Sequence, residues 1–106
     1  MRDALHGPAL HQAIARVVAR HLDPRAHRVW IVGSEAAGTA LPGSDVDVAL
    51  EGPAPVDLER LARLRSDLDM LPTLRTFDLV DLRRTSEGFR REALRVAIPL
   101  ELSASG

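Results

Sequence analysis

Two kinds of hydrophobic repeat alternate along the chain. Apolar side chains recur every three or four residues over 10–22 and again over 56–71, which is the spacing of one buried helix face. Apolar and β-branched residues run together instead at 28–32, 46–50 and 74–82, a pattern typical of strands. The chain is therefore expected to interleave helices with strands.

The remaining boundaries come from caps and prolines. Thr85 or Ser86 can cap a last helix that runs to about residue 96. Residues 98–102 then predict a short edge strand, where Pro99 is tolerated because an edge residue can do without its N–H. The order α-β-(α)-β-α-β-α predicts an α/β (α+β) fold, with helices packed on a small mixed sheet. At 106 residues the chain is expected to form a single domain, 1–106.

Composition narrows the class of partner. A formal net charge of −1 argues against a protein whose main task is to wrap nucleic acid, so no direct nucleic-acid binding is expected. No apolar run approaches the roughly 20 residues of a membrane span, and the first residues lack the apolar core of a signal peptide. A cytoplasmic protein with no membrane contact is the expectation.

The basic residues exclude two phosphate chemistries. All 14 are arginine, so the chain has no lysine for a P-loop and none to act as a covalent nucleophile. The pairs at 83–84 and 90–91 are either a basic patch or, as the favoured interpretation, a solvated face. The four histidines lie outside the motif described next and are expected on the surface or on helix faces.

Gly33 and Ser34 follow the first apolar strand, and Asp45 and Asp47 lie at the start of the second. Residues two apart on a strand point to the same face, so the two carboxylates project together and repel each other unless a cation lies between them. A Gly-Ser turn that opens a short helix offers backbone N–H groups to an anion. The stretch predicts a metal site beside a phosphate site.

Asp78 is the candidate for a third carboxylate. It interrupts an apolar strand, where burial of an unpaired charge would be costly. If that strand lies beside the strand of Asp47, three oxygen donors converge, and such a set suits Mg²⁺. Asp81 is the alternative, but it lies three residues further on and is expected to point to the opposite face.

These residues together resemble the minimal nucleotidyltransferases of the DNA-polymerase-β-like superfamily, whose signature is Gly-Ser, a ten-residue gap, Asp-x-Asp and a later acid. The resemblance covers nearly the whole chain and implies the nucleotidyltransferase fold. It implies that Asp45, Asp47 and Asp78 are catalytic and bind Mg²⁺, with Asp78 as the base for the incoming hydroxyl. It also implies that Gly33, Ser34 and Ser44 bind the nucleotide, with ATP as the substrate.

Two positions depart from the family pattern. Relatives commonly read Gly-Ser-x-Ala-Arg-Gly, whereas this chain has Glu35 at the variable position and Ala37 in place of the arginine. Loss of a cation and gain of an anion beside the triphosphate are expected to weaken nucleotide binding.

The resemblance further implies an antitoxin whose partner is a HEPN-domain toxin, modified by transfer of AMP from ATP. The chain has no tyrosine, so an acceptor tyrosine would lie on the partner. A catalytically weakened antitoxin that occludes its partner by binding alone is the alternative. Transfer to a small molecule such as an aminoglycoside is the third possibility, and no second domain is seen to hold that acceptor.

Overall fold

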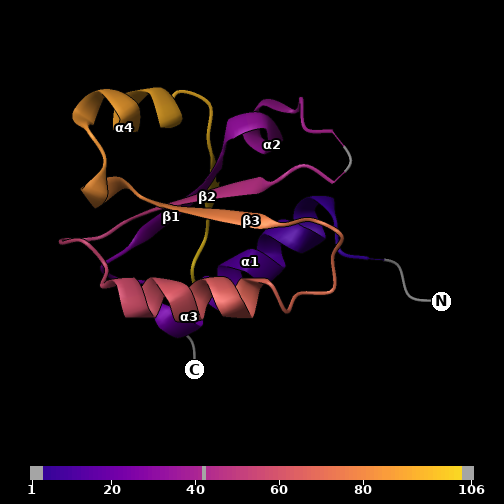
Figure 1. Cartoon of the computed structure of the whole chain (residues 1–106), viewed down its shortest axis with the longest axis horizontal. Helices are drawn as coiled ribbons and strands as arrows, with labels where there is room; N and C mark the ends of the chain where they lie inside the picture. Colours follow the sequence, from indigo (N-terminus) through magenta and orange to yellow (C-terminus); the bar gives the residue numbers. More distant parts are fainter. Residues whose placement is uncertain (1–3, 42, 104–106) are drawn as a thin grey trace.

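A four-stranded sheet of order β3-β2-β1-β4 lies at the centre of the computed structural model, which describes residues 4–41 and 43–103 (Figure 1). Pro42, expected in the loop before the second strand, lies outside the described residues. The elements in chain order are α1 (Gly7–His21), β1 (Arg28–Val32), α2 (Gly33–Ala37), β2 (Val46–Glu51), α3 (Leu58–Leu68), β3 (Phe77–Asp81), the short 3₁₀ helix η1 (Leu82–Arg84), α4 (Glu87–Ala93) and β4 (Ile98–Leu100).

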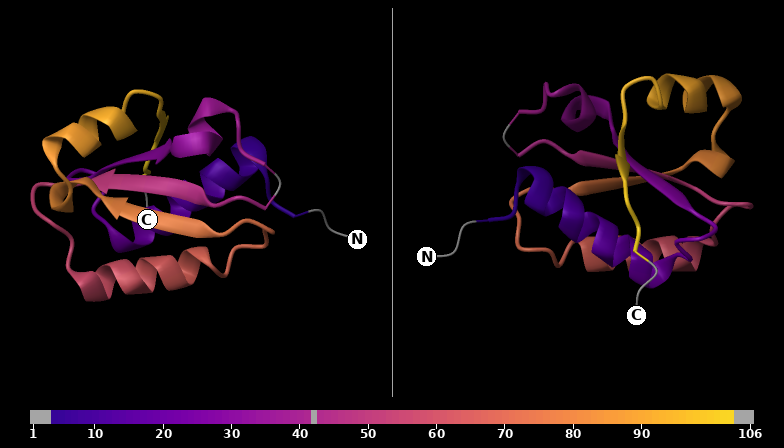
Figure 2. Two further views of the ribbon diagram at one scale, coloured as in Figure 1. Left: turned by 45° about the horizontal axis from the view of Figure 1, so that its top comes forward. Right: turned by 180° about the vertical axis from the view of Figure 1, so that it is seen from behind.

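The sheet is mixed, as the sequence predicted. β1 pairs antiparallel with both β2 and β4, whereas β2 and β3 run parallel and side by side (Figure 2, left). Pro99 lies opposite Trp30 on the edge strand β4. The predicted order of helices and strands is confirmed, including the short helix after the Gly-Ser turn.

Helices α1 and α3 cover one face of the sheet, which we call the closed face (Figure 1). Alternation along the strands sends apolar side chains to this face, where they meet the helices in one cluster. Its members from the sheet are almost fully buried: Val29, Ile31, Val46, Val48, Leu50 and Phe77.

Helices α2 and α4 lie on the opposite side, which we call the open face (Figures 1 and 2). Its buried cluster is smaller and joins the sheet to the segment that follows α4. Three buried residues form it, Val32, Ala49 and Leu82, with Trp30, Val80, Leu94 and Ala97 packed against them.

Two arginines fasten the 82–93 segment to the end of β2. Arg90 donates two hydrogen bonds to Glu51, from Nε at 2.6 Å and Nη2 at 2.9 Å. Arg83 donates from Nε to the Gly52 carbonyl at 2.6 Å. Arg83 is nevertheless exposed, in agreement with the favoured interpretation of a solvated face, whereas Arg90 is only partly exposed and is bound to Glu51.

Four predicted elements, α3, β3, α4 and β4, are shorter than the pattern suggested. Helix α3 begins at Leu58 because the Asp57 side chain accepts a hydrogen bond from the Arg60 N–H, at 2.8 Å. Leu58 lies exposed at the start of this helix, and Leu74 lies exposed before β3, although they were expected in the buried helix stripe and in the strand. Helix α4 is capped by Ser86 and ends at Ala93, because the following residues turn back onto the open face.

Candidate active site

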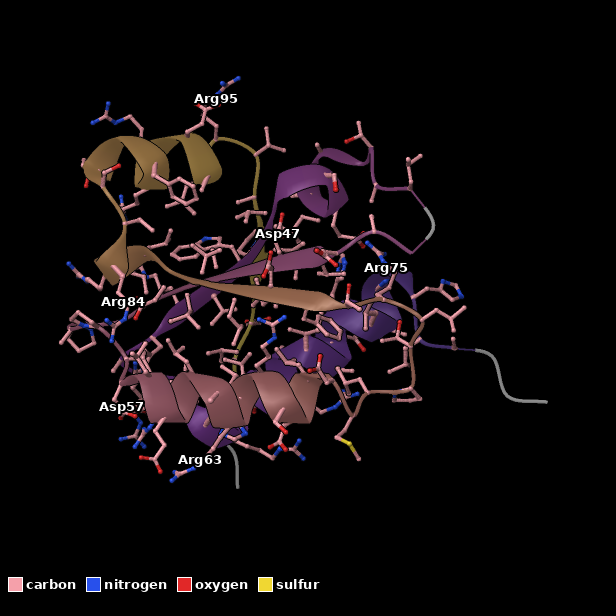
Figure 3. The ribbon with its side chains drawn as sticks, viewed as in Figure 1. Asp47, Asp57, Arg63, Arg75, Arg84 and Arg95 are labelled. Carbon is pink, nitrogen blue, oxygen red and sulfur yellow. The ribbon has the colours of Figure 1, made fainter. Side chains whose placement is uncertain are left out.

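Asp47 and Asp78 lie opposite each other on the parallel strands β2 and β3. Asp47 stands between the fully buried Val46 and Val48, so its side chain points to the open face, as Figure 3 shows. Asp45 lies one residue before β2, and its charge acts on Asp47. The structure thus brings the three predicted carboxylates to one region of the sheet.

The pKa of Asp47 lies above its usual range. Burial contributes most to this rise, and the negative charges of Asp78 and Asp45 add to it. All three effects disfavour the ionised carboxylate, and a bound cation would reverse the balance. The carboxylate that lies deepest in the cluster is therefore the one most in need of a positive charge.

Asp45 and Asp78 are both exposed. Asp45 accepts a hydrogen bond from the Thr76 hydroxyl, which turns its carboxylate toward the start of β3. Within residues 4–41 and 43–103, no three acidic or histidine side chains lie close enough to surround one ion together. Asp78 is exposed on the open face, so the sequence argument from a costly buried charge does not apply to it.

Gly33 brings the Gly-Ser turn into contact with Asp47. Its φ of +70° lies in the left-handed region, and a Cβ at this position would overlap the Asp47 Oδ2 atom. Ser34 follows within the first turn of α2, where helix N–H groups lack partners inside the helix. Glycine therefore allows the backbone of this turn to approach the carboxylate directly.

A pocket of about 520 Å³ opens between the sheet and α4. The Asp47, Asp78 and Gly33 positions lie among its walls, and Phe89 and Val96 are half-exposed there. Pockets that bind small molecules have similar volumes and the same mixture of apolar walls and a few polar groups. The lining residues are Val32, Gly33, Asp47, Asp78, Val80, Phe89, Glu92, Ala93, Arg95 and Val96.

Glu35 does not point into solvent beside the Gly-Ser turn. Its carboxylate lies 2.9 Å from Arg75 Nη1 and 2.9 Å from His11 Nε2, and the three side chains are largely buried. The expected weakening of nucleotide binding assumed an unpaired anion at Glu35, whereas this carboxylate is paired with Arg75 and His11. Ala37 is exposed at the end of α2.

Sequence reasoning missed Arg75 and also the contact with Glu35 that His11 makes from α1, although a helix position was expected for His11. Arg75 reaches Glu35 across 40 positions of the sequence and His11 across 24, so local spacing carries no trace of either contact. Charge complementarity to Glu35 was the one signal available.

Asp81 points to the opposite face from Asp78, as predicted. It is buried and accepts hydrogen bonds from the backbone N–H groups of Val56, at 2.8 Å, and Arg83, at 2.9 Å. This carboxylate therefore caps η1, holds the loop before α3 against it, and takes no part in the cluster. Asp78 is left as the third acid.

A Gly-Ser turn beside carboxylates on two neighbouring strands defines the class of nucleotidyltransferases. The chain belongs to the polymerase beta nucleotidyltransferase family, whose model matches residues 12–101. Among characterised sequences it is 30% identical over 89 residues to the Haemophilus influenzae protein described as "Probable protein adenylyltransferase MntA". The match covers 84% of this chain and 77% of that protein.

Solved structures of the same fold come from toxin-antitoxin complexes. One, a toxin-antitoxin crystal structure with AMP-PNP, aligns with a TM-score of 0.67 at 25% identity, over 88% of this chain and 73% of the other. A second is a Shewanella oneidensis MNT antitoxin in complex with its tri-AMPylated HEPN toxin. It aligns with a TM-score of 0.56 at 22% identity, over 88% of this chain and 73% of the other, and this likeness establishes only that the two chains share a fold. No helix in the described part of the chain is long and apolar enough to cross a membrane.

Proposed function

We propose that this protein is a Mg²⁺-dependent nucleotidyltransferase that transfers a nucleoside monophosphate, AMP from ATP, to a partner protein. The observation that carries the proposal is the pairing of Asp47 with Asp78 on adjacent strands, with Gly33 against Asp47. The pocket beside them has room for a nucleotide.

The residues present fit a magnesium ion. Carboxylate oxygens are the hard donors that Mg²⁺ prefers, and the raised pKa of Asp47 reflects burial and like charges that a cation would offset. Asp47 and Asp78, which lie opposite each other, would hold the ion, and Asp45 would complete the set if the three carboxylates, which do not surround one point in the described structure, drew together around it. When bound, Mg²⁺ would neutralise charge on the triphosphate and on the departing pyrophosphate.

The chain's own groups would position the reactants. The N–H groups at Gly33 and Ser34, with the Ser44 hydroxyl, would bind the phosphates. The acceptor oxygen would form a bond to the α-phosphorus as the bond to pyrophosphate breaks, and Asp78 would take the proton from the acceptor hydroxyl. Asp78 is exposed on an edge strand, so a hydroxyl on another protein can reach it.

The acceptor in this proposal is a HEPN-domain toxin, and the chain is its antitoxin, with both in the cytoplasm. Support comes from the Haemophilus influenzae relative, described as an adenylyltransferase, and from the fold shared with an MNT antitoxin bound to a tri-AMPylated HEPN toxin. The chain has no tyrosine, so modification of an aromatic hydroxyl would occur on the partner.

The test incubates the protein and its neighbour-encoded partner with Mg²⁺ and ATP and measures the partner's mass. The partner is expected to gain the mass of one or more AMP groups. Asp45→Asn and Asp47→Asn should abolish this gain. Asp69→Asn, which alters an exposed carboxylate at the end of α3, should keep it. No added mass with the unmodified protein, while a related adenylyltransferase works in parallel, would refute the catalytic claim.

Ala37 supports the second candidate function, an antitoxin that silences its partner by occlusion. Without the family's arginine the site has one cation fewer for the triphosphate. Calorimetry separates the two: absence of heat with ATP and Mg²⁺, together with tight binding of the partner, would favour occlusion.

A further inference from the structure

The segment that joins α2 to β2, residues 38–45, carries Ser44 and Asp45 and contains no helix or strand in its described part. We call it the active-site loop. Three backbone hydrogen bonds shape its described part: Gly38 N–H to the Glu35 carbonyl at 3.3 Å, Thr39 N–H to the Ser34 carbonyl at 2.9 Å, and Ser44 N–H to the Leu41 carbonyl at 3.0 Å. All three are local, so none fixes the far end of the loop relative to the Gly-Ser turn.

Arg75, which Figure 3 labels near the start of β3, makes that connection. Its Nε donates to the Ser44 carbonyl at 2.7 Å, its Nη2 to the Ser44 hydroxyl at 3.3 Å, and its Nη1 lies 2.9 Å from Glu35 Oε1. One planar guanidinium therefore joins α2 to the last residues of the loop. Only arginine offers donors in such a fork, and a lysine could not satisfy all three contacts.

Glu35 is itself held in place. Its second oxygen lies 2.9 Å from His11 Nε2 of α1, so the chain of contacts runs from α1 through Glu35 and Arg75 to Ser44. Burial acts to raise the pKa of Glu35, but the hydrogen bonds from His11 and Arg75 outweigh it and hold that pKa below its usual value. The carboxylate is thus kept ionised opposite the guanidinium.

Thr76, which follows Arg75, binds Asp45, which follows Ser44 in the loop. Its hydroxyl donates to the Asp45 carboxylate, and its carbonyl accepts from the Val46 N–H at 2.8 Å. Residues 75 and 76 therefore fix residues 44 and 45 in register. A change in the position of Arg75 would move the carboxylate that opens the Asp-x-Asp pair.

We infer that Arg75, oriented by Glu35 and His11, is a positioning residue for the nucleotide site, acting by locking Ser44 and Asp45 against α2. The effect of Arg75 on nucleotide binding rests on the proposed function. The effect of Arg75 on the loop rests on the structure alone. In this inference Glu35, one of the two departures from the family pattern, orients Arg75.

The first experiment measures calorimetric affinity for AMP-PNP with Mg²⁺. Arg75→Gln is expected to weaken binding by about 10- to 100-fold, the range for residues that orient ligands of a metal site. Arg75→Lys should recover part of the loss. Glu35→Gln should weaken binding less, and the double variant Glu35→Gln/Arg75→Gln no more than Arg75→Gln alone, because both changes break one chain of contacts.

The matched control is Arg63→Gln, which removes the same group from an exposed ion pair with Glu59 on α3. It should bind nucleotide as the unmodified protein does. Unchanged affinity in Arg75→Gln, or effects of the two single changes that simply add, would overturn the inference.

The second experiment needs no nucleotide. In Arg75→Gln, amide hydrogen exchange should quicken at Thr39, Ser44 and Val46, while the buried Ile31 amide keeps its protection; Arg63→Gln should leave all four unchanged. Unchanged exchange in the loop would refute the inference even in an active protein. If the unmodified protein binds no nucleotide, the proposed function fails, and loop exchange alone then decides the inference.

Discussion

The two faces of the sheet are built from the same strands and have opposite characters. On the closed face, apolar side chains from three strands meet α1 and α3 in one large cluster. On the open face the buried cluster has three residues, and a pocket of about 520 Å³ separates α4 from the carboxylates. Asp47 and Val48 are adjacent in the sequence, yet the Asp47 side chain lies on the open face and the Val48 side chain lies on the closed face.

This difference shows how a small domain can carry a charged site without losing its fold. Burial of apolar area on one face supplies most of the stability, since hydrophobic burial is the dominant favourable contribution to folding. The other face is then free to hold carboxylates that repel one another. Changes on the closed face should therefore alter stability first, and changes on the open face should alter binding first.

The closed face should give the largest loss of stability. Leu64 of α3 is fully buried, and Leu64→Ala is expected to lower the free energy of unfolding by about 2–5 kcal/mol, because it removes apolar contacts and leaves a cavity. Urea denaturation measures this. Leu58→Ala, on the exposed start of the same helix, should change it by less than about 0.5 kcal/mol. Equal losses would contradict the assignment of the core.

Gly33→Ala tests the open face. The left-handed φ should cost about 1–2 kcal/mol, and the added Cβ would press on the Asp47 carboxylate, so binding of AMP-PNP should be lost as well. Gly38→Ala is the control, since Gly38 has a φ of +76° with nothing within 4 Å of the added Cβ. It should show the strain alone. Loss of binding in both variants would mean that contact with Asp47 is not what matters.

Capping residues compare the helices of the two faces. Ser86 caps α4 and Asp57 caps α3, each by accepting one backbone N–H. Replacement of either by alanine should cost about 1 kcal/mol in urea denaturation. Only Ser86→Ala should also weaken nucleotide binding, because α4 forms a wall of the pocket. Weaker nucleotide binding in Asp57→Ala would contradict the expectation that only changes on the open face alter binding.

The smallest expected effect depends on pH. Hydrogen bonds from Arg90 hold the pKa of Glu51 below its usual value, against the opposing effect of burial. A folded-state pKa below the unfolded one stabilises the fold above the unfolded value, about 4.3, and the contribution disappears as the pH falls through the folded value.

Glu51→Gln should therefore lower the thermal midpoint by a few degrees near neutral pH, and the difference from the unmodified protein should shrink in acid. Glu87→Gln serves as the control, because it changes a more exposed carboxylate that lies 3.8 Å from the same arginine, within α4. A difference that persists unchanged to low pH would show that the Arg90 contact is not the cause.

Much of the fold followed from local pattern. Strand alternation predicted that Asp81 does not share the face of Asp78, and the burial of Asp81 beside the exposure of Asp78 agrees with this. It also predicted that Asp45 and Asp47 share a face, and the charge of Asp45 acts on Asp47, although Asp45 lies one residue before β2. The β2–β3 pairing, on which the convergence of the carboxylates depends, could be stated only as a condition, because sequence spacing does not reveal which strands are neighbours.

The surroundings of the site could not be predicted for the same reason. Arg75 lies 40 positions from Glu35, and Arg90, which fastens α4 beside the pocket, binds Glu51, 39 positions earlier. Such contacts form across the fold and leave no periodic signal. The start of α3 was displaced for a local reason, because Asp57 accepts a backbone N–H there, whereas the Ser86 cap of α4 was one of the two expected.

The edge strand β4 has a consequence for the time at which the sheet is completed. It pairs with β1, so Val29 and Leu100, roughly seventy residues apart, become neighbours. Pairing at such a separation is slow, because a long loop must close before any contact is gained. During synthesis the β1 edge stays unprotected until residues 98–100 have left the ribosome. A newly made chain would therefore be most vulnerable to pairing with other chains at a moment when its carboxylate site could already have formed.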